Sequence, residues 1–272
     1  MTTQQQDLVF FDDNSLLSDK IITPENRELH IITHAEGTQP AWLINSLIET
    51  CLIGTANSVN RDLVRTASPR ASVTYVSFLH PKEFVFKSCR KQGLDLECTN
   101  DFFFVDCFSE LFSKQIVTPE DSKAQIDALF SGIIKQIHSN SRGSHVVVVD
   151  SPELLLSATN LSSNDLIHHL QRVNQDCNSM IVVSNIDDAL IDMGSVTPAD
   201  PVYRITDFFV KLHHKSSLNV NLSPLSTGKA KDITGCLTVS KGALPPRASV
   251  RVLQKEYVFH VSKESNVKIF FR

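Results

Sequence analysis

The chain has 272 residues and a mass of 30.3 kDa, with 42% hydrophobic and 21% charged residues. These proportions are typical of a globular protein with a substantial buried core. It contains no apolar run of about 18 residues, and its N-terminus has neither a basic nor a long apolar segment. The sequence therefore predicts neither a membrane span nor a secretory signal, and we expect residence in the cytoplasm and nucleus.

Charge is segregated along the chain, although the net charge is only −4. Residues 1–60 hold eight acidic and two basic residues, and residues 61–91 hold two acidic and seven basic residues. Residues 92–193 hold fifteen acidic and five basic residues, and residues 194–272 hold five acidic and twelve basic residues. Such blocks suit a protein that meets partners of opposite charge, and they equally fit solvated faces of a single domain. The six cysteines are scattered without a C-x-x-C pair, so we expect reduced thiols.

The chain divides into an acidic N-terminal segment, residues 1–27, and one α/β domain, residues 28–272. We expect the segment to pack on the core or on a partner through its apolar anchors. Residues 29–33 predict a buried strand, and residues 40–53 predict a helix whose apolar residues recur at three- and four-residue spacing. Trp42 lies on this stripe, which favours packing in a core or interface over stacking on a base.

Strands and helices then alternate, as in a parallel sheet covered on both faces. His145–Asp150 (HVVVVD) is the clearest strand, because four consecutive valines predict burial on both sides of the sheet. The other predicted strands are residues 72–79, 101–108 and 180–184, and the predicted helices are residues 83–93, 120–138 and 166–176. Residues 185–203 predict a long loop.

The pattern changes after this loop, where apolar and polar residues alternate between turn residues. We interpret residues 205–212, 218–222, 233–239, 257–261 and 267–271 as strands, with a polar hairpin tip at residues 226–232. The sequence thus predicts an antiparallel extension on a mostly parallel sheet.

The loop of residues 34–41 occupies the position at which RecA-like ATPases bind phosphates. The order of strand, loop and helix, then a strand ending in Asp150, then terminal hairpins resembles that class and implies its three-layer α/β fold: a central, mostly parallel sheet flanked by helices, with C-terminal antiparallel hairpins. Those ATPases carry G-x-x-x-x-G-K-[ST], whose lysine and hydroxyl bind phosphate and Mg²⁺. Here the loop reads Glu36, Gly37, Thr38, Gln39, Pro40, Ala41.

This loop lacks the chemistry of a phosphate site. Pro40 removes an amide donor, and Glu36 places negative charge where phosphates would approach. We therefore predict that the chain does not hydrolyse nucleotides and needs no cofactor. Asp150 has the position of the Walker B acid, and two interpretations are open: a remnant of a metal-binding site, or an aspartate that caps the turn at Ser151.

No other catalytic or metal-binding constellation is visible. The adjacent pairs His168–His169 and His213–His214 do not chelate one ion on a helix or a strand. The sequence contains no G-x-S-x-G or H-E-x-x-H motif. We predict no metal site.

Three segments together resemble a specific family. They are HAEGTQPAWLINSL (residues 34–47), HVVVVDSPELLL (residues 145–156) and VLQKEYVFHVSKESNVKIFFR (residues 252–272). With the degenerate RecA-like layout, they resemble the family of the sixth subunit of the Elongator complex in fungi. The resemblance covers essentially the whole chain.

This resemblance implies an accessory, non-catalytic role. It implies a hetero-hexameric ring with the fourth and fifth Elongator subunits, contact with the large catalytic subunits, and binding of tRNA in an ATP-linked way. The ring supports modification of wobble uridines in tRNA. No membrane partner is implied.

RNA contacts require basic side chains, because they neutralise phosphates. The loops after the fourth and fifth strands, which RecA-like rings present to their channel, are nearly free of Lys and Arg, apart from Arg204 at the exit of the second. The remaining candidates are Arg61, Arg65, Arg70, Lys87 and Arg90, with Lys82 and Lys91 beside them. A solvated or subunit-facing basic surface is the alternative interpretation of this group.

Two other functions remain open at this point. One is an active RecA-like nucleotide hydrolase with an unorthodox phosphate loop, which predicts ATP turnover that depends on Asp150. The other is a recombination paralogue that assembles on DNA, which predicts a preference for single-stranded DNA over tRNA.

Overall fold

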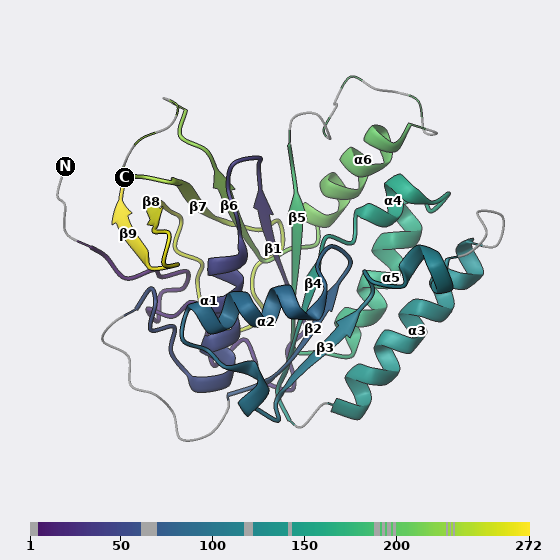
Figure 1. Cartoon of the computed structure of the whole chain (residues 1–272), viewed down its shortest axis with the longest axis horizontal. Helices are drawn as coiled ribbons and strands as arrows, with labels where there is room; N and C mark the ends of the chain where they lie inside the picture. Colours follow the sequence, from purple (N-terminus) through teal and green to yellow (C-terminus); the bar gives the residue numbers. More distant parts are fainter. Residues whose placement is uncertain are drawn as a thin grey trace.

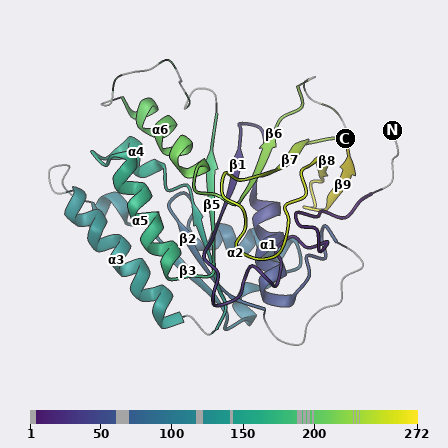
Figure 2. The ribbon, with the colours of Figure 1, turned by 180° about the vertical axis from the view of Figure 1, so that it is seen from behind.

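The computed structural model describes residues 5–60, 70–116, 122–140, 143–187, 191, 194, 197, 200–226, 228, 230 and 232–272. It shows a central sheet with helices on both faces (Figures 1 and 2). Within these residues, no helix has the length and apolarity needed to cross a membrane.

Among the described residues, one mixed sheet forms the centre of the fold, and its nine strands follow the order β3-β2-β4-β5-β1-β6-β7-β8-β9. The pairs from β3 to β6 along this order are parallel, and the pairs from β6 to β9 are antiparallel. The strands are β1 (Glu28–His34), β2 (Ser72–Ser77), β3 (Phe102–Asp106), β4 (His145–Asp150), β5 (Ser179–Asn185), β6 (Leu218–Ser223), β7 (Gly235–Lys241), β8 (Lys255–Val261) and β9 (Val267–Phe271). The mostly parallel sheet with an antiparallel extension and the RecA-like fold class are confirmed.

The helices cover the two faces of the parallel part of the sheet. Helices α1 and α2 lie on one face, and α3, α5 and α6 lie on the other (Figures 1 and 2). The helices are α1 (Ala41–Ile53), α2 (Lys82–Lys91), α3 (Ser122–Asn140), α4 (Leu154–Ala158), α5 (Ser163–Gln175) and α6 (Pro201–His213).

Strand β4 shows how the core is divided by the sheet. Its alternate valines Val146 and Val148 belong to the core under α1 and α2, whereas Val147 and Val149 belong to the core under α3, α5 and α6. All six residues of the strand are buried, and β4 lies between β2 and β5. This burial explains the four-valine run, because side chains on both faces of a covered strand must be apolar.

The prediction of a strand at residues 205–212 was wrong, because these residues form most of α6. Ile205, Phe208 and Leu212 recur at helical spacing and are buried, and the same segment also reads as an alternating pattern. The residues just before this segment favour a helix over a strand. Asp200 caps it by accepting a hydrogen bond from the Val202 amide at 2.9 Å, and Pro201 occupies the first turn.

The N-terminal segment contributes to the core on the side of α1. Leu8, Phe10, Phe11 and Leu17 are buried there with residues of α1 and β6. Phe11 also forms an isolated bridge with Val252.

Candidate functional site

The loop between β1 and α1 is a tight corner whose backbone groups are bonded within the protein. The amide and hydroxyl of Thr38 both donate to the Ala35 carbonyl, at 3.1 and 2.6 Å. The Glu36 amide donates to the Asp187 carboxylate. Gly37 turns the chain with φ at 83°, a conformation that favours glycine. Two of the amides that a phosphate would need are therefore already committed to protein acceptors.

Helix α1 begins where the phosphate-binding lysine and hydroxyl would lie. Pro40 is its N-cap residue, with φ −78° and ψ −10°, and no side chain caps this end. Neither Pro40 nor Ala41 can donate a hydrogen bond from a side chain to phosphate. The corner between β1 and α1 is therefore present, and helix α1 begins with two residues that offer no side-chain donor.

Asp150 lies at the carboxyl end of β4, with its side chain buried and fully engaged. Its Oδ2 accepts hydrogen bonds from the Tyr75 hydroxyl at 3.1 Å and the Ser77 hydroxyl at 3.4 Å, and Oδ1 accepts one from Ser151 at 3.1 Å. Burial raises the pKa of Asp150, and His80 with these hydroxyls opposes that rise. This network ties the carboxylate to β2 and to the side chain of the next residue, Ser151.

The corner and Asp150 line one cavity of about 210 Å³, together with residues of β2 and α2. The imidazole of His80 stacks on the ring of Phe84 in the lining, with ring centroids 4.1 Å apart. Small-molecule sites usually enclose about 300–1,000 Å³. The structure thus brings Gln39, Pro40, Ala41 and Asp150 together around a cavity smaller than most small-molecule sites.

Glu153 is a buried acid that the sequence interpretation did not single out. Its carboxylate accepts hydrogen bonds from the Ser184 hydroxyl at 2.8 Å and the Asn185 amide at 3.0 Å. Burial raises the pKa of Glu153 to about 7. The Glu153 carboxyl therefore joins the start of α4 to the end of β5. Nothing in the local sequence distinguishes Glu153 from an exposed glutamate.

One member of the first histidine pair, His169, packs against helix α3. His169 is buried with its ring stacked on Phe130, at 4.6 Å between centroids, and its Nδ1 lies 3.8 Å from the Asp127 carboxylate. Burial is the main reason that the pKa of His169 is lowered. Among the residues with described positions, no cluster of three or more His, Cys, Asp or Glu side chains could hold a metal.

Several arginines considered for RNA contact make bonds within the chain. Arg70 forms an ion pair with Asp19 at 2.6 Å and donates to the Leu17 carbonyl at 2.8 Å, which ties the N-terminal segment to the end of α1. Arg90 is exposed and forms an ion pair with Glu97 at 2.9 Å. Arg61 and Arg65 lie outside the described residues.

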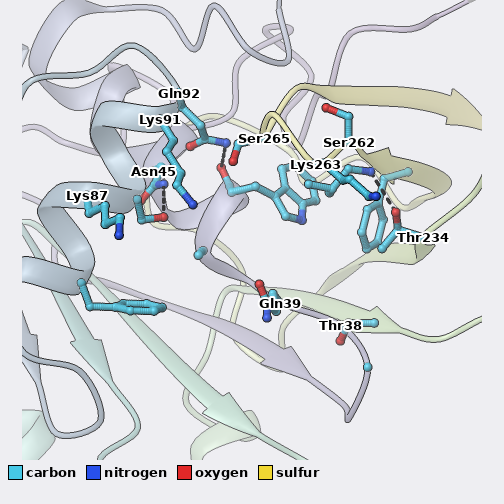
Figure 3. A pocket seen from close by; sticks show the side chains of 17 residues that line it. Thr38, Gln39, Asn45, Lys87, Lys91, Gln92, Thr234, Ser262, Lys263 and Ser265 are labelled. Carbon is cyan, nitrogen blue, oxygen red and sulfur yellow. Dashed lines mark hydrogen bonds between the residues drawn. The ribbon is translucent and has the colours of Figure 1, made fainter.

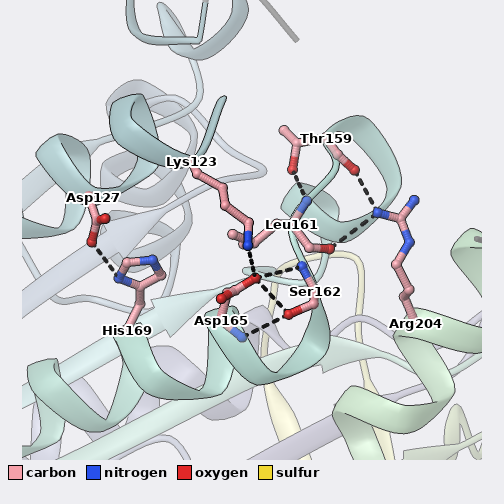
Figure 4. Close-up of polar contacts among 8 residues, drawn as sticks. All are labelled: Lys123, Asp127, Thr159, Leu161, Ser162, Asp165, His169 and Arg204. Carbon is pink, nitrogen blue, oxygen red and sulfur yellow. Dashed lines mark hydrogen bonds and ion pairs between the residues drawn. The ribbon is translucent and has the colours of Figure 1, made fainter. Parts of the chain in front are cut away.

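Arg204 holds the connection between α4 and α5 (Figure 4). Its guanidinium donates to the carbonyls of Thr159 at 2.7 Å and Leu161 at 3.2 Å. The same figure shows the capping box at the start of α5, in which Ser162 and Asp165 bond each other, with Lys123 of α3 paired to Asp165 at 3.0 Å. Arg204 therefore has a structural task that its position at a loop exit does not indicate.

We expect Arg204→Ala to lower the free energy of unfolding by about 1.5–3 kcal/mol, because it removes charged hydrogen bonds to two carbonyls. Urea denaturation followed by circular dichroism measures this. As a control, exposed Lys135→Ala is expected to change stability by no more than about 0.5 kcal/mol. An equally small change for Arg204→Ala would contradict the structural task.

A larger cavity, of about 620 Å³, lies beside the corner and includes Lys87 (Figure 3). Lys87 and Lys91 reach it from α2, and Lys263 reaches it from the turn between β8 and β9. The lining contains no Asp or Glu. The spacing of Lys87 and Lys91 on one helix was visible in the sequence, but the presence of Lys263 in the same cavity lining was not.

Comparison with known proteins places this fold and site in context. The chain is 32% identical to Elongator complex protein 6 of Saccharomyces cerevisiae over 281 aligned positions, which cover 100% of this chain and 99% of that protein. It is 23% identical to Elongator complex protein 6 homolog of Schizosaccharomyces pombe over 186 positions, covering 66% and 70% of the two chains. No protein-family model matches the sequence.

Proposed function

The chain belongs to the Elongator complex protein 6 family, and from this premise we propose that it is a non-catalytic, RecA-like subunit of an Elongator complex. The observation that carries the proposal is the identity to Elongator complex protein 6 along the full length of both chains.

In this proposal the chain assembles with the fourth and fifth Elongator subunits into a hetero-hexameric ring and contacts the large catalytic subunits. The ring binds tRNA in an ATP-linked way and supports modification of wobble uridines. Exposed aromatic residues support a partner surface: the side chains of Phe108 and Phe112, just after the edge strand β3, are 46% and 54% exposed. Large apolar side chains grouped on a surface often mark interfaces.

The non-catalytic role is supported by the corner at β1 and α1. Pro40 and Ala41 stand where a lysine and a hydroxyl would bind phosphate and Mg²⁺. The carboxylate of Asp150 is buried and accepts hydrogen bonds from three hydroxyls, so most of its acceptor capacity is used within the protein.

Purification of the tagged chain from its own cells, followed by mass spectrometry, tests the assembly. We expect the related Elongator subunits to co-purify in near-equal amounts. Deletion of the gene is expected to remove carboxymethyl-type wobble uridines from bulk tRNA, as measured by nucleoside mass spectrometry. Purification without any Elongator subunit, or unchanged wobble uridines, would overturn the proposal.

A turnover assay distinguishes this role from that of a nucleotide hydrolase. We expect the purified chain to release no phosphate from ATP above the level of a matched Asp150→Asn variant, because its corner lacks the phosphate-binding groups. Turnover that Asp150→Asn abolishes would favour the hydrolase. Preference for single-stranded DNA over tRNA in a competition assay would favour the DNA-binding paralogue.

A further inference from the structure

A groove of about 380 Å³ lies at the amino ends of β1, β5 and β6, at the opposite end of β1 from the corner. Helices α5 and α6, which cover this face of the sheet (Figure 2), and the segment between β7 and β8 contribute to its lining. No residue of the corner, of α2 or of the β8–β9 turn is part of the described lining, so the groove is separate from the two cavities beside the corner. We name it the α5–α6 groove, after a lining that includes the apolar residues Leu29, Ile167, Leu170, Met180, Leu212 and Leu244.

The floor of the α5–α6 groove is apolar and buried. Each of the six apolar residues except Leu244 is 7% exposed or less, whereas Leu244 is 50% exposed. The groove thus combines space above buried apolar atoms with an apolar side chain that water still contacts. A bulky apolar side chain from another molecule would remove both surfaces from water, and burial of apolar surface drives association.

The backbone around Leu244 is fixed by its own bonds and by the residues that follow. The Leu244 amide donates a hydrogen bond to the Ser216 carbonyl at 3.0 Å, which ties this segment to the chain before β6. Pro245 and Pro246 come next, and proline restricts both its own φ and the residue before it. This edge of the groove is therefore ordered before a partner binds, which lowers the entropic cost of covering it.

Basic residues border the apolar floor. The lining contains Arg27, Lys215 and Arg247 against the single carboxylate of Glu28, which leaves two net positive charges. Among the described residues, none of these three cations forms an ion pair. Positive charge gathered at a concave surface raises the local concentration of anions.

Two contacts hold the charged groups in place without neutralising the groove. The Arg27 guanidinium donates to the Gln175 carbonyl at 2.9 Å, so its position is set by a neutral acceptor. The Glu28 carboxylate is buried and accepts a hydrogen bond from the Arg247 amide at 2.6 Å. Glu28 is thus used to attach the segment after β7 to the start of β1, and the side chain of exposed Arg247 is left to meet an anion.

The combination of an apolar floor and basic borders indicates an acidic peptide rather than a nucleic acid. Bases of single-stranded nucleic acids stack on aromatic side chains, and the described lining of the groove contains none. We propose that the α5–α6 groove binds a segment of a partner protein in which a bulky apolar residue is flanked by Asp or Glu. The apolar residue enters the floor, and the carboxylates pair with Arg27, Lys215 and Arg247.

This proposal does not rest on the Elongator assignment, because it concerns the chemistry of a surface and its test uses synthetic peptides. Failure of the Elongator subunits to co-purify would overturn the proposed function and leave the peptide measurements unaffected. Failure of the peptides to bind would overturn the groove and leave the assembly unaffected.

A peptide array supplies the probes for the purified full-length chain. Its peptides carry Leu, Met or Phe at varied spacing among glutamates, and matched peptides replace either the apolar residues by serine or the glutamates by lysine. We expect the acidic, apolar peptides to bind, and the best of them to lose at least about tenfold in affinity in either matched version, as measured by fluorescence anisotropy. An acidic, apolar set that binds no better than its matched versions would overturn the proposal.

Charge-matched variants locate the binding. Lys215→Gln/Arg247→Gln removes two charges from the groove, and Lys241→Gln/Arg251→Gln removes two charges outside its lining. We expect the first variant to weaken binding of the best array peptide by about tenfold or more, and the second by less than about twofold. Similar losses in both would overturn the proposal. Leu244→Ser tests the apolar edge independently, because an exposed side chain can be shortened without loss of the fold, and unchanged binding in this variant would also count against the groove.

Two further measurements test other occupants. If labelled tRNA binds the chain and Lys215→Gln/Arg247→Gln alone weakens that binding, the groove is an RNA surface and the proposal is overturned. Light scattering during size-exclusion chromatography tests a second copy of this chain, because self-association that the same variant abolishes would assign the groove to that copy and overturn the proposal. We expect equal tRNA binding and an equal mass for the original chain and the variant.

Discussion

Gly242→Ala is expected to give the largest loss of stability of any single substitution considered for this protein. A Cβ atom at Gly242 would lie 2.0 Å from the backbone oxygen of Ser216, which no side-chain rotation can relieve. Gly242 follows β7, and its amide donates to the Ser217 carbonyl at 3.0 Å. We expect the free energy of unfolding to fall by about 3 kcal/mol or more, since overpacking against a fixed backbone forces the chain apart.

The same substitution at Gly132 is the control. Gly132 lies in α3, and a Cβ there would meet no atom within 4 Å. Gly132→Ala is expected to raise stability by about 0.5–1 kcal/mol, because alanine is the better helix former. Urea denaturation of both variants measures the contrast. A Gly242→Ala protein as stable as the original would contradict the close approach of β7 to the chain before β6.

The fold was predictable where local pattern and burial agree. The valines of β4 could only belong to a strand covered on both faces, and β1, the corner and α1 follow from apolar spacing with Pro40 at the helix start. Helix α6 was missed because Ile205, Phe208 and Leu212, spaced by three and four residues, were interpreted as part of an alternating pattern, and Asp200 was not recognised as its cap.

The functional geometry was less predictable, because it depends on pairs that are distant in sequence. Lys87 and Lys263 line one cavity only because the antiparallel extension lies beside α1 and α2. The hydrogen bonds from Arg204 to the Thr159 and Leu161 carbonyls also could not be predicted from the sequence. By contrast, the lack of a phosphate-binding lysine in the loop of residues 34–41 could be seen directly in the sequence, because it depends only on the residues of that loop.

Stability is expected to depend on the ionisation of Glu153, whose pKa burial raises to about 7 from an ordinary value of 4.5. Between these values the folded protein holds a proton that the unfolded chain releases, so the contribution of Glu153 to stability falls as pH rises. The difference corresponds to about 3 kcal/mol. Buried His30 and His145 act in the opposite direction, because burial lowers each pKa to about 4, so their protonation on unfolding destabilises the fold as pH falls from 6.5.

Glu153→Gln isolates this contribution, because the two histidines are unchanged in the variant and cancel in the comparison. Glutamine can still accept the Asn185 amide hydrogen bond, and its own amide can donate to the Ser184 hydroxyl. We expect the two proteins to be about equally stable near pH 4.5, and the variant to be more stable by about 3 kcal/mol near pH 8.

Urea denaturation at both pH values measures the effect, with exposed Glu264→Gln as the control. The control is expected to differ from the original protein by no more than about 0.5 kcal/mol at either pH. If Glu153→Gln and the original protein differ by the same amount at both pH values, Glu153 ionises in the folded state as it does in the unfolded chain. In that case the contacts with Ser184 and Asn185 compensate for its burial, and the carboxyl acts as a permanent anionic link between α4 and β5.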